Sequence, residues 1–254
     1  MAKLPFALQL YSVRGPLETD LNATLQRVKA IGYDHVETAG LHGHSAAQFA
    51  ASLADAGLHA ISAHVAYERC AADVDEVIGE CRTLGVQWAV IPWLSPEENR
   101  TAEDWRARAA AMAFFGARFR AAGISLCYHN HTHEFETEEG KTFFDLIFET
   151  AAPESLLVQL DVGWAHYAGV DPVALLKVHA GRVPLIHVKD VKMRVAGEAP
   201  VPTELGNGAT RFAPVFKVAG DTGVQWLIVE QDESMRDPLE SARLNAAYMR
   251  VHVY

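Results

Sequence analysis

Acidic and imidazole side chains lie near the ends of three short apolar segments in the second half of the sequence. Asp161 ends the run LLVQLD, His187 lies in PLIHVKD, and Glu230 lies in VQWLIVEQD. Each run has the length and composition of a buried strand. Burying such groups is costly without compensation, and a divalent cation is the simplest compensation. The three residues are therefore candidate ligands of one divalent metal ion, and this set of imidazole and carboxylate donors suits Mn²⁺, Mg²⁺, Co²⁺ or Zn²⁺.

The elements that must position these residues alternate between strand and helix along the whole chain. Helical spacing is clear in Leu17, Leu21, Leu25 and Val28, and Thr101 begins a capping box with Asp104. Strict alternation predicts parallel strands joined by right-handed crossovers. Eight such units in 254 residues predict a (β/α)8 TIM barrel with a single domain over residues 1–254. The predicted strands cover residues 6–12, 35–40, 58–65, 86–93, 124–131, 156–161, 184–190 and 224–232.

The carboxyl ends of all strands in such a barrel meet at one mouth, where the active sites of this fold lie. Taken singly, each polar residue there could equally cap a turn or pair with a neighbour, but together they favour a common site. The candidates for this mouth are Gln9, Glu37, His64, His129, His131, Glu134, Glu136, Asp161, His166, His187, Lys189 and Glu230.

Composition excludes several classes of partner. The formal net charge is −10, and no basic cluster is present that could neutralise nucleic-acid phosphates. No apolar run reaches the ~18 residues that span a bilayer, and the N-terminal residues do not resemble a secretory signal. The three cysteines form no CxxC pair, which is typical of a reducing compartment. We therefore expect a cytoplasmic protein with no membrane or nucleic-acid partner, in which Cys127 belongs to the core.

Several segments together resemble the sugar isomerase/epimerase superfamily of xylose isomerase-like TIM barrels. The resemblance covers nearly the whole chain, is strongest from Tyr128 to Glu233, and best fits the subgroup with an HNHxxEF signature, which is related to inosose dehydratases and keto-sugar epimerases. The segments that carry it are LQLYSVR, HVETAG, YHNHTHEFE, LDVGWAHYAG, IHVKD, ELGNG and WLIVEQDE.

The resemblance implies one divalent metal held by Glu, Asp, His and Glu from the last four strands. Asp161, His187 and Glu230 match the last three ligands by position. Many relatives have the first Glu inside the fifth strand, where this chain has Cys127 and Tyr128. In the HNHxxEF subgroup we expect Glu134 to take this place, with Glu136 as the alternative.

The same resemblance implies roles for the other mouth residues. Glu134 and Glu230 are the expected catalytic acid and base. Trp93 and Trp164 could stack on a sugar, although a rim tryptophan can equally cover apolar surface. The expected substrate-binding residues are Gln9, Glu37, His64, His131, His166 and Lys189.

The expected chemistry is removal of a proton from a carbon beside a carbonyl, assisted by a metal that stabilises the enediolate. Returning the proton to the same carbon or to its neighbour gives epimerisation or isomerisation, and expelling a β-hydroxyl gives dehydration of a keto-inositol or keto sugar. Two glutamates favour the first two outcomes. An endonuclease acting on abasic DNA shares this fold but needs a basic groove, and a non-catalytic sugar-binding barrel needs no second glutamate. The sequence also leaves open whether the protein is a homo-oligomer.

Overall fold

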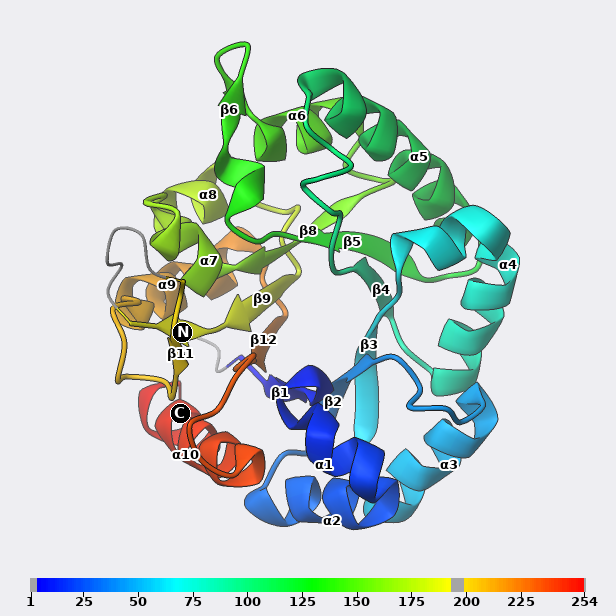
Figure 1. Cartoon of the computed structure of the whole chain (residues 1–254), viewed down its shortest axis with the longest axis vertical. Helices are drawn as coiled ribbons and strands as arrows, with labels where there is room; N and C mark the ends of the chain where they lie inside the picture. The colour runs from blue at the N-terminus through cyan, green and yellow to red at the C-terminus, as the bar shows by residue number, and fades with distance from the viewer. Residues whose placement is uncertain (1–3, 193–198, 254) are drawn as a thin grey trace.

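The computed structural model describes residues 4–192 and 199–253. Eight parallel strands close into a barrel in the order β1-β12-β9-β8-β5-β4-β3-β2, which confirms the predicted (β/α)8 architecture (Figure 1). Each barrel strand falls inside its predicted range. The strands are β1 (Phe6–Gln9), β2 (His35–Ala39), β3 (His59–His64), β4 (Trp88–Ile91), β5 (Ser125–His129), β8 (Leu157–Asp161), β9 (Leu185–Val188) and β12 (Trp226–Val229).

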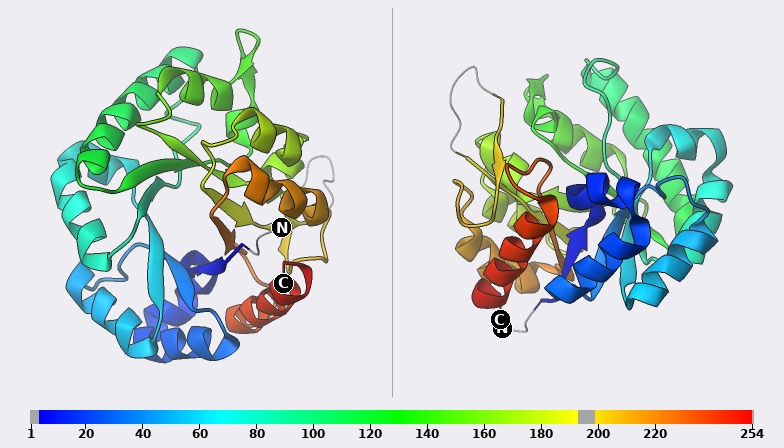
Figure 2. Two further views of the ribbon diagram at one scale, coloured as in Figure 1. Left: turned by 180° about the vertical axis from the view of Figure 1, so that it is seen from behind. Right: turned by 60° about the horizontal axis from the view of Figure 1, so that its bottom comes forward.

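Helices surround the barrel on its outer side (Figures 1 and 2). Their starts follow local sequence signals: Ser45, Thr101 and Thr142 each form a capping box, which supplies partners for the first backbone N–H groups of the helix. The helices are α1 (Arg14–Thr19), α2 (Leu21–Ile31), α3 (Ala46–Ala56), α4 (Tyr67–Leu84), α5 (Ala102–Ala121), α6 (Phe143–Thr150), α7 (Val162–Tyr167), α8 (Pro172–Val178), α9 (Phe212–Ala219) and α10 (Pro238–His252). Within the described ranges, none is long and apolar enough to cross a lipid bilayer.

The structure departs from the predicted elements at several helices and loops. The helix expected around Leu17–Val28 is two helices, because Asp20 is extended and caps α2 by accepting a hydrogen bond from Ala23 N. The sequence predicts a helix over residues 73–84, whereas α4 begins at Tyr67 and is kinked at Asp73. The sequence predicts a glycine turn after Asp161, whereas this segment is the short helix α7. The sequence predicts polar loops over residues 132–141 and 191–210, whereas short antiparallel strand pairs form there, β6 (Thr137–Glu138) with β7 (Lys141–Thr142) and β10 (Asp190–Val191) with β11 (Pro202–Thr203).

Alternation along the strands divides the barrel interior into an apolar layer and a polar layer. A small cluster that includes Trp88, Cys127, Leu185 and Ile228 fills the lower interior, so Cys127 is in the core as predicted. Side chains two residues further along a strand point to the same face. The strands that contribute Cys127, Leu185 and Ile228 therefore also contribute His129, His187 and Glu230 above them.

Candidate active site

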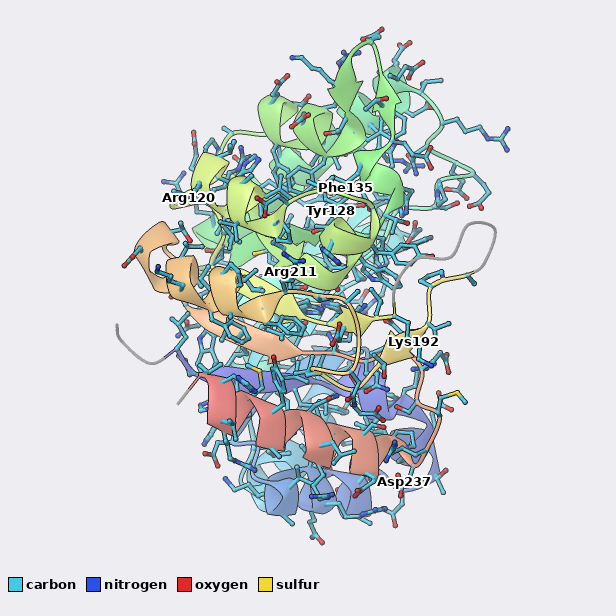
Figure 3. The ribbon with its side chains drawn as sticks, turned by 90° about the vertical axis from the view of Figure 1, so that its left-hand side faces the viewer. Arg120, Tyr128, Phe135, Lys192, Arg211 and Asp237 are labelled. Carbon is cyan, nitrogen blue, oxygen red and sulfur yellow. The ribbon has the colours of Figure 1, made fainter. Side chains whose placement is uncertain are left out.

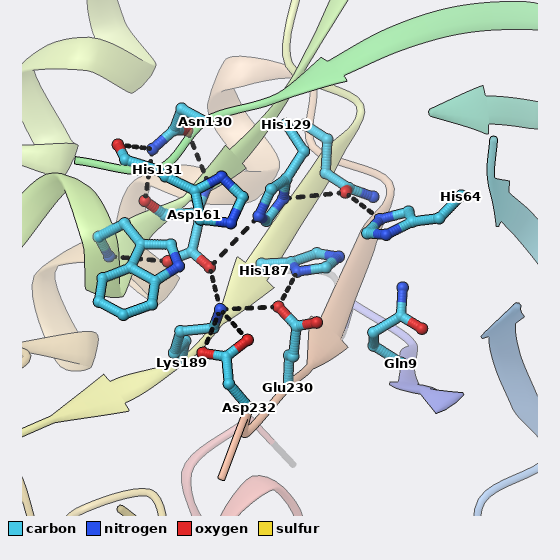
Figure 4. Close-up of polar contacts among 12 residues, drawn as sticks. Gln9, His64, His129, Asn130, His131, Asp161, His187, Lys189, Glu230 and Asp232 are labelled. Atoms are coloured by element: carbon cyan, nitrogen blue, oxygen red, sulfur yellow. Dashed lines mark hydrogen bonds and ion pairs between the residues drawn. The ribbon is translucent and has the colours of Figure 1, made fainter. Parts of the chain in front are cut away.

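Four side chains from neighbouring strands meet at the carboxyl end of the barrel. They lie at or near the ends of β5, β8, β9 and β12, which are consecutive strands of the barrel. In the same order, the residues are His129, Asp161, His187 and Glu230. Each residue offers one ligand atom, and the four atoms lie within 4.8 Å of one another (Figure 4). All four residues are buried. Two imidazole nitrogens and two carboxylate oxygens in one buried cluster form a set of donors that can hold a borderline divalent ion.

Lys189 lies beside this cluster and is fully buried. Its Nζ is 3.3 Å from Asp161 Oδ2, 2.9 Å from Glu230 Oε2 and 2.8 Å from Asp232 Oδ2. It also lies 4.6 Å from the ring centroid of Trp164. Burial alone would lower the pKa of Lys189, but the three carboxylates raise it above its usual value, so the side chain is an ammonium ion.

A further carboxylate, Glu37, lies beneath the cluster and is also fully buried. Gln9 Nε2 donates to its Oε1 at 2.7 Å, and Gln159 Nε2 donates to its Oε2 at 2.6 Å. Ser62 Oγ donates to Oε2 as well, at 2.5 Å. His187 Nε2 lies 2.6 Å from Glu37 Oε1, so Glu37 connects the cluster to the strands on the opposite side of the barrel.

The charges of this interior are set by close pairing. Burial opposes protonation of His187, yet Glu230 and Glu37 raise its pKa to about 10 because each contacts one of its two ring nitrogens. Burial acts to raise the pKa of Glu230, but Lys189 and the His187 imidazolium hold it well below its usual value. Burial raises the pKa of Asp161 to about 6, and Lys189 and His187 act in the opposite direction.

Asp161 provides a test of whether a metal fits this cluster. Its Oδ1 accepts a hydrogen bond from Trp164 N at 2.8 Å, which caps α7, whereas its buried Oδ2 accepts no hydrogen bond from the described residues. Such an oxygen, facing His129 and Lys189, is suited to coordinate a cation. To ligate, His187 must lose the proton from one nitrogen, as metal-bound imidazoles do. The four residues therefore fit a divalent ion.

The structure does not bring Glu134 into this cluster. The short 3-10 helix His133–Phe135 contains it, and its carboxylate accepts hydrogen bonds from Tyr128 Oη and from His131 N, both at 2.7 Å. Glu134 is fully buried and also lies 3.1 Å from His133 Nε2. Its alternative, Glu136, is exposed and lies outside the cluster too. The predicted role of Glu134 as ligand and catalytic group stays a prediction.

A cavity of about 640 Å³ opens above the cluster and reaches Glu230 and His129. Predicted substrate contacts His64 and His131 line it, as do Trp93 and Trp164, so its walls combine imidazoles with aromatic faces. Among the other predicted contacts, Gln9 and Glu37 are buried in the layer below the cluster, and Lys189 is buried beside it. His166 is on α7 and lines other cavities, away from this one.

His129 was expected among the mouth residues without a role of its own, and Gln159, Ser62 and Asp232 were not among the predicted site residues. Strand alternation could have found two of them. Gln159 is two residues before Asp161, and Asp232 is two residues after Glu230, so each could share the face of its neighbour. Ser62 carries no comparable signal, because a register irregularity between β2 and β3 changes which residues face Glu37.

A comparison with protein families identifies the barrel. A family model described as "Xylose isomerase-like TIM barrel" matches residues 25–251. The chain belongs to the xylose isomerase-like TIM barrel family. This confirms the resemblance that the sequence motifs carry.

Individual proteins are similar to this chain at low sequence identity. An inosose dehydratase of Clostridium botulinum (strain Alaska E43 / Type E3) is 27% identical over 169 residues, which are 58% of this chain and 54% of that protein. The chain therefore spans about half the length of the curated relatives it matches. A sugar phosphate isomerase/epimerase from Parabacteroides distasonis ATCC 8503 has 25% identity and a TM-score of 0.80, over 98% of this chain and 94% of that one. The IOLI protein with a bound zinc atom has 16% identity and a TM-score of 0.76, over 98% of both chains, and shows the common fold.

Proposed function

We propose that this protein is a metal-dependent enzyme that removes a proton from a carbon beside a carbonyl of a sugar, and that epimerisation or isomerisation is the outcome. The observation that carries the proposal is the buried cluster of His129, Asp161, His187 and Glu230, of which His129 and Glu230 line a cavity of about 640 Å³. When bound there, a divalent ion would stabilise negative charge developing on the carbonyl oxygen of the substrate. The zinc in the IOLI protein supports a metal-dependent reaction, and the isomerase/epimerase name of the Parabacteroides protein supports epimerisation or isomerisation as its outcome.

Glu230 is the proposed base. Its Oε2 lies 2.9 Å from His187 Nδ1 and 2.9 Å from Lys189 Nζ, so these two cations hold the carboxylate in place. Neither of these two contacts involves Oε1. The pKa of Glu230 lies well below its usual value despite burial, mainly because of Lys189 and His187. The carboxylate is therefore ionised at neutral pH and ready to accept a proton from a substrate carbon in the cavity.

The rest of the cavity suits a sugar. His64 and His131 offer hydrogen-bonding nitrogens to hydroxyl groups, and Trp164 and Trp93 offer flat apolar faces. Burial lowers the pKa of His131 to about 3, so its imidazole is neutral and can donate or accept. This combination favours a small polyhydroxylated ring or chain as the substrate.

Dehydration is the second candidate, because the curated relatives that match this chain include inosose dehydratases. It would begin with the same proton removal by Glu230 and end with loss of a hydroxyl group from the next carbon. The expected substrate of this reaction is a keto-inositol.

The proposed function is tested by incubating the Mn²⁺-loaded protein with a panel of keto sugars and keto-inositols in D₂O. We expect deuterium at the carbon beside the carbonyl of the substrate or product. An epimer or isomer supports the first candidate, and an unsaturated product that absorbs in the ultraviolet supports the second. Turnover without deuterium at that carbon, together with no exchange of unreacted substrate, would contradict proton removal by a solvent-accessible base.

The variants His129→Ala and Glu134→Gln test which of these two residues binds the metal together with Asp161, His187 and Glu230. We expect His129→Ala to weaken Mn²⁺ binding by more than about 100-fold, since loss of a residue that merely supports a ligand already costs about 10- to 100-fold. Glu134→Gln should stay within about tenfold of wild type, below the loss caused by a residue that supports a ligand, because the contacts of Glu134 are with Tyr128, His131 and His133 and not with the cluster. Equilibrium dialysis measures both affinities, and Glu136→Gln is the matched control. A large loss with Glu134→Gln and none with His129→Ala would support the glutamate that the family pattern implies.

A further inference from the structure

His166 lies at a second, separate depression on the outer side of α7. Two neighbouring cavities of about 550 and 400 Å³ are both lined by His166, Gly169 and Arg211. We call the pair the side cavity. Trp164, two residues earlier on the same short helix, lines the mouth cavity instead, so α7 separates the two.

The polar lining of the side cavity is basic. Arg211 and Lys192 are exposed and His166 is half-buried, and within the described part of the chain none of the three makes an ion pair or a side-chain hydrogen bond. The acidic residue in the lining, Asp171, caps α8, and its Oδ1 accepts a hydrogen bond from Val173 N at 2.9 Å. In a chain with a net charge of −10, these cations mark a place where an anion is favoured.

The backbone beside Arg211 adds to this preference. Helix α9 begins directly after Arg211, which provides no side-chain cap, and its first turn contains no acidic residue. No acidic side chain in the first turn therefore compensates the partial positive charge at the N-terminus of α9, which lies next to Arg211. Arg211 and Lys192 both line the smaller half of the side cavity and are labelled in Figure 3.

The larger half of the side cavity is apolar. Its lining includes Val170, Pro172, Val173, Pro214 and Val215. A ligand that fills both halves would have an anionic end and a carbon body. A guanidinium and an ammonium group together match the charge of a phosphate monoester, which is about −1.5 to −2 at neutral pH.

We propose that the side cavity binds a small organic phosphate. Arg211 and Lys192 bind the phosphate group, and the valine and proline side chains of the apolar wall contact the carbon body of the ligand. This site is distinct from the metal cluster and does not depend on the proposed function. His166 borders both halves and provides a further hydrogen-bond donor.

The test is titration of phenyl phosphate into the protein by isothermal titration calorimetry at low ionic strength. Wild type should bind it saturably, and inorganic phosphate more weakly because it lacks the apolar body. Arg211→Gln and Lys192→Gln should each weaken binding by about tenfold, the loss expected for one charge-assisted contact. The double variant should lose about 100-fold.

Arg120→Gln is the matched control, because Arg120 is also exposed but lies at the end of α5 and does not line the side cavity. It should bind phenyl phosphate like wild type. Unchanged binding by the double variant, or an equal loss with Arg120→Gln, would overturn the assignment of the site. Equal affinity for inorganic and phenyl phosphate would overturn the role of the apolar wall. The melting temperature of each variant verifies that it is folded.

Discussion

Glu230→Gln is expected to lower turnover by about 10²- to 10⁴-fold, the usual contribution of a positioned acid or base. The amide keeps the size of the side chain and an oxygen that can still contact a metal, but it cannot accept the proton from carbon. His187 and Lys189 would lose a charged partner at 2.9 Å, so we also expect weaker metal binding. Turnover and deuterium incorporation should therefore be measured with the metal site saturated.

Glu233→Gln is the control for this variant. Glu233 follows the same strand, but its side chain is 76% exposed and pairs with Arg14 at the surface. It should retain wild-type exchange. If Glu230→Gln with bound metal incorporates deuterium at the wild-type rate, Glu230 is not the base.

Glu37→Ala is expected to destabilise the fold by about 3–5 kcal/mol, the range for breaking a buried charge pair by removing one partner. The change leaves the His187 imidazolium without one of its two carboxylates and removes an acceptor from Gln9, Ser62 and Gln159. These donors lie in the barrel interior, where water cannot easily replace the lost partner. Urea unfolding followed by circular dichroism measures the change in the free energy of unfolding.

Glu68→Ala on the exposed surface of α4 is the matched control, and it should change the free energy of unfolding by less than about 0.5 kcal/mol. A Glu37→Ala protein as stable as this control would show that the buried network adds no net stability.

Burial acts against the charged form of Glu37, but His64 and His187 hold its pKa below the ordinary range. The stabilisation it gives should thus be fully present at neutral pH and decrease progressively once the pH falls below the ordinary pKa of a glutamate.

Local sequence signals were sufficient to predict the barrel. Most strands lie in apolar runs, and helices begin at residues such as Ser45 and Thr101, whose side chains cap them. The departures arose where a single side chain changes the local structure. Asp20 divides one amphipathic pattern into two helices, and Asp161 caps α7 with the oxygen that does not face the cluster.

The site was predicted where a residue lies at or near the end of a strand. Asp161, His187 and Glu230 were found in this way, because parallel strands in a barrel bring their ends together. The contact between Glu37 and His187, 150 residues apart, depends on closure of the barrel and has no local signal. Glu134 illustrates the opposite case: its spacing fits a family pattern, but the 3-10 turn that contains it directs its carboxylate to Tyr128 and to the backbone of His131.

The proposed metal centre is tested most directly by the number of divalent ions that the protein binds at equilibrium. After removal of metal with a chelator, wild type dialysed against Mn²⁺ should bind one ion per chain and gain melting temperature, because a ligand of the native state stabilises it. His187→Ala should bind none at the same concentration. If wild type binds no ion, or if His187→Ala binds one ion as tightly as wild type does, the cluster of His129, Asp161, His187 and Glu230 is not a metal site.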